Sequence, residues 1–156
     1  MKQYSKDLPN KVERMGGKFV LNYHLQETTE EEILSLWKDF NYGMKEDYGQ
    51  PDDSFKEEHK YNFNQVIVPM GKWKYDEVVS AIIRDKYRED EMEAITNNLA
   101  AVNAMFFQTL VSEGIVEAIK LLKDSYKSED TERFKEMQEW RALAKKEAKS
   151  IFNANK

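Results

Sequence analysis

The side chains best suited to chemistry are two histidines and three groups of acids. His24 and His59 are the only histidines, and the acids stand at Glu30–Glu32, Asp52-Asp53 and Glu89–Glu91. A metal site needs three or four such ligands at set distances, and proton transfer needs paired groups. Neither histidine belongs to a short ligand motif, and the acids lack the spacing of a calcium loop. We therefore predict no catalytic, cofactor-binding or metal-binding residues.

An enzymatic activity would need another arrangement of the same groups. Carboxylates from Asp47–Glu58 would have to converge with His24 or His59. The glycines are scattered and form no phosphate-binding loop, and no serine stands in a nucleophile elbow. The chain has no cysteine, which excludes disulfides and thiol catalysis. We therefore expect that the protein is not an enzyme and needs no cofactor.

Aromatic side chains are the better candidates for binding a partner, because Trp, Tyr and Arg dominate the energetics of protein interfaces. Trp73 is the first candidate, since it follows a glycine turn and lies outside the regular apolar patterns. A lid over the strand–helix junction is the competing and more ordinary role for this side chain. The full set of candidate partner-binding residues is Trp73, Tyr75, Trp37, Trp140 and Arg141.

The composition narrows the classes of partner. A chain of 156 residues suits a single domain, 1–156, and its net charge of −5 is spread along the chain. An acidic protein without a basic patch is a poor nucleic-acid binder. No window reaches the apolar length of a membrane span, and the N-terminus lacks the apolar core of a secretory signal.

The N-terminal half predicts a small antiparallel sheet. We expect residues 1–17 to form an extended or loosely held arm. Residues 18–26 alternate between apolar and polar side chains, which predicts a strand with one buried face, and residues 61–68 predict its neighbour. Between them, Thr28-Thr29 and the following acids predict the start of a short helix, with a strand as the competing interpretation because of Leu34, Leu36 and Phe40. Residues 41–60 predict a loop.

The region 72–152 predicts helices. Residues 73–98 form two short apolar stripes separated by Arg88–Glu91, and Asn97-Asn98 predicts a stop or bend. Ser112–Gly114 predicts a second break. Ser128 predicts the start of a last helix that runs to about Phe152. The predicted fold class is α+β and mostly helical, with a small antiparallel β-hairpin or sheet packed by C-terminal helices.

Two segments carry a family resemblance, YDEVVSAIIR at Tyr75–Arg84 and MQEWR at Met137–Arg141. They resemble the Tyr-Asp-x-Ile-Val-x-x-x-Ile-Arg helix and the Met-Gln-x-Trp-Arg core of small proteins of tailed phages and prophages of gut Bacteroidota, with Val78 in place of the first Ile. The strand segments LNYHL and YNFNQVIVP are similar to the family's front half. The resemblance excludes residues 27–58, and the chain departs from it by a longer middle and by Arg88 in place of Ser.

The resemblance implies a setting more than an activity. It implies a virion-associated structural or assembly protein near the tail, baseplate or portal, which contacts other phage structural proteins or further copies of itself. The alternative is a phage-encoded intracellular effector that binds and inhibits a host protein such as a defence nuclease. The expected location is therefore the virion or the host cytoplasm.

Overall fold

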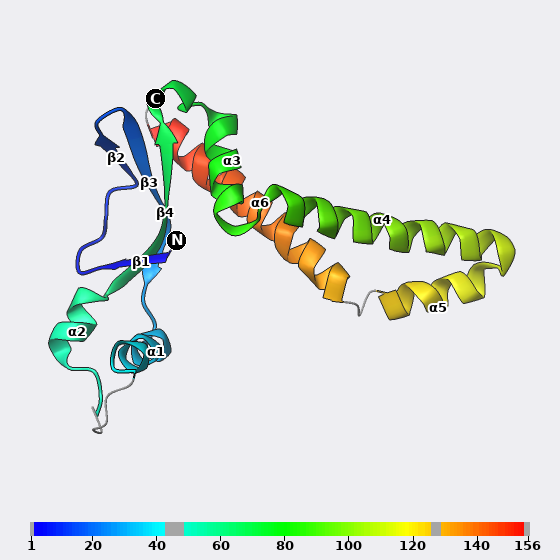
Figure 1. Cartoon of the computed structure of the whole chain (residues 1–156), viewed down its shortest axis with the longest axis horizontal. Coiled ribbons are helices and arrows are strands. Elements are labelled where there is room, and N and C mark those ends of the chain that lie inside the picture. The colour runs from blue at the N-terminus through cyan, green and yellow to red at the C-terminus, as the bar shows by residue number, and fades with distance from the viewer. Residues whose placement is uncertain (1, 43–48, 126–128, 155–156) are drawn as a thin grey trace. The chain divides into compact units, whose positions relative to one another are not determined.

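The computed structural model describes residues 2–42, 49–125 and 129–154. Within these residues the fold is α+β and mostly helical, with a four-stranded antiparallel sheet in the N-terminal half, which confirms the predicted fold class (Figure 1). Contacts divide the chain into a sheet unit, Met1–Glu77 with Asn153–Lys156, and a helical unit, Val78–Phe152. The organisation as a single domain stays a prediction.

The sheet has the strand order β1-β4-β3-β2. The predicted strands are the two central ones, β3 at Lys18–Glu27 and β4 at Tyr61–Pro69. The expectation of a loosely held N-terminal arm is wrong, because β1 at Lys2–Ser5 and β2 at Val12–Met15 pair into the sheet as its two edges. Each edge strand has only four residues, which is too short to show an alternating pattern and depends on a longer neighbour for stability.

The middle of β3 is covered on both faces, which corrects the prediction of one buried face. Residues 20–23 are all buried. The Asn22 side chain donates to the Asn10 carbonyl at 2.8 Å and accepts from the Gln65 amide at 3.0 Å. The segment between β1 and β2 therefore satisfies a buried polar group, which a period-two pattern cannot reveal.

Two helices lie in the excursion between β3 and β4, at one end of the sheet (Figure 1). Helix α1, Glu30–Phe40, begins as predicted, with the Thr29 hydroxyl accepting from the Glu32 backbone N–H at 3.3 Å. Helix α2, Asp53–Glu58, lies in the segment expected to be a loop and is capped by Asp52. A short 3₁₀ helix, η1, follows β4 at Met70–Lys72.

Four helices follow: α3 at Tyr75–Lys86, α4 at Glu89–Ser112, α5 at Ile115–Ser125 and α6 at Glu129–Ala154. The predicted breaks near residues 88 and 113 are confirmed, and Ser128 lies outside the described residues. The predicted stop at Asn97-Asn98 is wrong, because both asparagines are exposed and α4 continues through them. The Asn98 amide donates to Asp130 of α6 at 3.0 Å.

The core of the helical unit joins α4, α6 and the connection between α3 and α4. Tyr87, Ile95 and Met137 are buried together, and the half-buried side chains packed against them are Met92, Phe134 and Trp140. Among the described residues, no helix combines the length and apolar character that a membrane crossing requires.

Candidate partner-binding site

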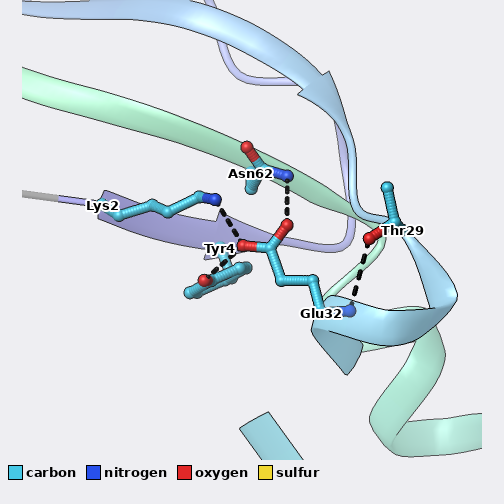
Figure 2. Close-up of polar contacts among 5 residues, drawn as sticks. All are labelled: Lys2, Tyr4, Thr29, Glu32 and Asn62. Atoms are coloured by element: carbon cyan, nitrogen blue, oxygen red, sulfur yellow. Dashed lines mark hydrogen bonds and ion pairs between the residues drawn. The ribbon is translucent and has the colours of Figure 1, made fainter. Parts of the chain in front are cut away.

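Glu32 holds α1 against the sheet through three side chains from two strands (Figure 2). Its Oε1 accepts a hydrogen bond from the Tyr4 hydroxyl of β1 at 2.8 Å and forms an ion pair with Lys2. Its Oε2 accepts from the Asn62 amide of β4 at 3.2 Å. Asn62 is 1% exposed, so this carboxylate satisfies a buried donor that water does not reach.

The electrostatics of this cluster keep it in one protonation state at neutral pH. Burial raises the pKa of the Glu32 carboxyl, but the hydrogen bonds from Lys2 and Tyr4 and the Lys2 charge outweigh burial and lower it. Burial and the Glu32 carboxylate raise the pKa of Tyr4 to about 12. Glu32 is therefore charged and Tyr4 neutral, as a structural hydrogen bond requires.

Five rings continue outward from this cluster, and we call them the aromatic row: Tyr4, His59, Phe55, Trp37 and Phe40. Ring centroids are 5.7 Å apart for Tyr4 and His59, 4.1 Å for His59 and Phe55, and 4.8 Å for Phe55 and Trp37. Phe40 lies 5.9 Å from Phe55 and 6.4 Å from Trp37. The row thus links β1, α2 and α1 through contacts at favourable aromatic distances.

The outer end of the aromatic row faces solvent. Phe40 is 71% exposed, and the neighbouring Tyr42 is 91% exposed. The Trp37 indole is half-buried and donates to the Gly49 carbonyl at 3.2 Å, which holds its orientation. A hollow of about 200 Å³ at α1 is lined by Glu30, Ile33, Leu34, Gln50, Pro51 and Lys56. An exposed aromatic patch with a polar rim is typical of a protein-binding surface.

Three of the predicted partner-binding residues lie in the sheet unit. Trp37 belongs to the aromatic row. Trp73 is half-buried, and its ring centroid lies 4.3 Å from that of Phe19 at the strand–helix junction, which is the geometry of a lid. Tyr75 opens α3 and is 38% exposed. Of these three, Trp37 has the surroundings best suited to a partner.

Trp140 and Arg141 lie in the helical unit. The Trp140 indole donates to the Ile82 carbonyl at 3.1 Å, and the Lys86 ammonium lies 4.8 Å from its ring centroid. The Trp140 side chain is therefore engaged largely in contacts within the helical unit. Arg141 lines a hollow of about 150 Å³ whose other lining residues are Ser80, Ile83, Arg84, Glu89 and Met92.

Sequence reasoning missed Phe40 and Phe55 as surface residues. Phe40 stands three residues after Trp37 in the apolar pattern of α1, and such spacing is more typical of a buried side chain than of an exposed one. Phe55 stands in a polar segment, where only Asp52 three residues earlier signalled the helix that presents it. Phe55 and His59 are also four residues apart, the helical spacing that allows their rings to stack.

The histidines have local surroundings of their own. A His59 ring nitrogen lies 2.8 Å from the Phe55 carbonyl, and His24 stands at the register shift in β3 with φ of 54°. No three His, Asp or Glu side chains gather as a metal site in the ranges 2–42, 49–125 and 129–154. Asp47, which the enzymatic alternative would use, lies outside the described residues.

No family model, no curated protein and no solved structure matches the chain. The fold and the site therefore define its class. It is an α+β protein, mostly helical, whose sheet unit carries an exposed aromatic surface next to a partly buried polar cluster around Glu32.

Proposed function

We propose that the protein is a non-enzymatic, virion-associated structural or assembly protein of a tailed phage, which acts through contacts with other phage structural proteins near the tail, baseplate or portal. The setting is supported by the resemblance over Tyr75–Arg84 and Met137–Arg141. The mode of action is supported by the aromatic row, and the exposure of Phe40 is the observation that carries it.

The aromatic row is suited to binding because it is ordered before a partner arrives. Trp37 is held by the Gly49 carbonyl, and the α1 helix that carries it is held by Glu32. Binding therefore costs little additional side-chain ordering. Burial of an exposed Phe contributes about 1.5–3 kcal/mol, so Phe40 and Trp37 together supply a hot spot of ordinary strength.

Quantitative mass spectrometry of purified particles tests the setting. We expect a stoichiometric signal that matches the symmetry of the tail, baseplate or portal. Absence from particles, with abundant protein in infected cells, would contradict the structural role.

A pair of variants tests the surface. Phe40→Ser should leave a folded protein in infected cells and remove it from particles, because the change is made at an exposed ring. Leu8→Ser is the matched control, since Leu8 is 62% exposed in the same unit and lies outside the aromatic row. Equal incorporation of both variants would exclude the aromatic row as the contact.

The alternative function is an intracellular effector that binds and inhibits a host protein such as a defence nuclease. The net charge of −5 favours it, as do Glu30 and Glu31, which are exposed on the helix that carries Trp37. An acidic rim complements a basic nucleic-acid channel. This function predicts a protein that is absent from particles and a complex that weakens steeply as salt is raised.

A further inference from the structure

Most of α4 has no charged side chain. From Ala94 to Ser112 the sequence holds only apolar residues, Thr, Asn, Gln and Ser. This stretch is helical throughout and about 28 Å long at 1.5 Å per residue. The solvent-facing side of a surface helix normally carries charged and polar residues, so exposed apolar side chains in an uncharged stretch call for an explanation.

One side of this stretch is covered within the helical unit. The inner stripe consists of Ile95, Leu99, Val102, Phe106 and Leu110, all buried or half-buried. Leu99 and Val102 line a hollow of about 700 Å³ that Leu122 of α5 and Phe134 of α6 also line. This side of α4 therefore faces α5 and α6 across the hollow.

The opposite side is an outer stripe that faces solvent. Ala100, Ala104, Phe107 and Val111 are spaced by four, three and four residues, which is the repeat of a helix–helix seam. All four are exposed, Phe107 by 63% and Val111 by 87%. The sequence of the outer stripe is small, small, large, large.

We propose that two copies of the chain pair antiparallel through the outer stripe of α4. A twofold axis between residues 105 and 106 places Ala100 opposite Val111 and Ala104 opposite Phe107. Each large side chain then meets a small one, which fills space evenly across the seam. A parallel pair would place Phe107 against Phe107 and Ala104 against Ala104, which crowds one level and leaves a gap at the other.

Charge also favours a second copy as the occupant. A partner with charged side chains would leave them buried without a counter-ion against this surface. The outer stripe of another copy has none, and a twofold axis makes one surface complementary to itself. The antiparallel arrangement also keeps the acidic first turns at Glu89–Glu91 at opposite ends of the pair.

The uncharged surface is particular to α4. The next helix, α5, also exposes Ile115 and Val116, but it carries an ion pair between Lys120 and Glu117 at 2.8 Å. A contact from Ala100 to Val111, about 17 Å long at 1.5 Å per residue and one helix wide, belongs to the smaller class of interfaces. We therefore expect a reversible dimer with a dissociation constant in the micromolar range. This pairing does not depend on the proposed function.

Sedimentation velocity of the full chain over a concentration series tests the dimer. The natural sequence should shift from monomer to dimer as concentration rises. Val111→Lys should weaken dimerisation by about tenfold or more, because it places two charges in the seam. The control Leu8→Lys makes the same kind of change at an exposed site of the sheet unit and should have no effect. A natural sequence that stays monomeric, or equal behaviour of the two variants, would overturn the proposal.

A charge exchange tests the antiparallel register. Ala100→Glu and Val111→Lys should each be mainly monomeric alone. When the two variants are mixed, they should form a heterodimer in which the introduced carboxylate meets the introduced ammonium at one end of the seam. The native contact between Ala100 and Val111 remains at the other end. A mixture that stays monomeric while the natural sequence dimerises would overturn the antiparallel pairing. Circular dichroism of each variant verifies that the helices remain intact.

Discussion

The aromatic row of the sheet unit and the outer stripe of α4 both expose apolar side chains, but they are built in different ways. The aromatic row comes from β1, α1 and α2 and depends on the Glu32 cluster, whose partners are distant in sequence. The outer stripe comes from one helix and depends only on helical spacing. A surface assembled from distant segments is irregular and suits a different protein, whereas a periodic, uncharged stripe suits its own copy.

The aromatic row and the outer stripe also differ in the charge of the residues around them. The aromatic row has charged residues at its edge, with Lys56 and Glu30 lining the adjacent hollow. The outer stripe has no charge along its length. A charged rim steers and selects a partner, while an uncharged seam selects by shape alone. A substitution in one surface should therefore leave the function of the other surface unchanged.

The largest effect is expected in the core of the helical unit. Met137 is fully buried beside Tyr87 and Ile95, so Met137→Ala should lower the free energy of unfolding by about 2–5 kcal/mol. Val111→Ala changes an exposed residue and should alter it by less than about 0.5 kcal/mol when measured on the monomer. Urea denaturation followed by circular dichroism at low protein concentration measures both. Similar losses in the two variants would mean that the outer stripe is already covered in the monomer.

The next effect concerns the Glu32 cluster. Glu32→Gln presents an amide donor to groups that are themselves donors, either Lys2 and Tyr4 or Asn62. The expected loss of stability is about 1–3 kcal/mol, because a buried hydrogen-bonding group then lacks its acceptor. Glu31→Gln is the matched control, since Glu31 is exposed on the same helix turn, and should change stability by less than about 0.5 kcal/mol. Equal effects would show that Glu32 does not hold α1.

The same variant should change how stability depends on pH. The pKa of Glu32 is lowered on folding, so its contribution is present above the unfolded pKa of about 4.3 and is lost as pH falls through the lower folded pKa. The pKa of Tyr4 rises from 10.0 to about 12, so its contribution is present below pH 10.0 and is lost as pH rises towards 12. Urea denaturation across pH should show both losses in the natural sequence and a smaller acid loss in Glu32→Gln. If Glu32→Gln lost as much stability at low pH as the natural sequence does, Glu32 would not be the group responsible for that loss.

Local patterns predicted the elements that local forces determine. The Thr29 cap, the break before Glu89 and the turn at Gly114 all follow from side-chain hydrogen bonding, the helix dipole or the positive φ of glycine, and all three are found. The edge strands β1 and β2 were missed, because four residues form a strand only when a neighbour pairs with them.

Neither surface could be predicted completely from the sequence. The Glu32 cluster joins residues about thirty positions apart in the chain, and no local pattern records such contacts. The uncharged run from Ala94 to Ser112 is visible in the sequence, but its spacing permits two apolar stripes. Only the packing of α4 with α5 and α6 determines which stripe remains exposed.

The smallest changes in stability are expected at two adjacent threonines at the start of α1, Thr28 and Thr29. Thr29 caps the helix by accepting from the Glu32 N–H, so Thr29→Ala should lower the free energy of unfolding by about 1 kcal/mol. The Thr28 hydroxyl is buried and has no hydrogen-bond partner among the described residues. Thr28→Val keeps the shape and removes this unpaired polar atom, so stability should be unchanged or slightly raised.

Urea denaturation measures the stability of both threonine variants. Binding and dimerisation assays on the same variants sharpen the contrast between the two surfaces. Thr29→Ala loosens the turn that carries Glu32, so it should weaken any binding that uses the aromatic row and leave dimerisation through α4 unchanged. A loss of stability in Thr28→Val would mean that its hydroxyl has a partner in solution. If Thr29→Ala also altered dimerisation, the two surfaces would be coupled, and the independence inferred from their different construction would be wrong.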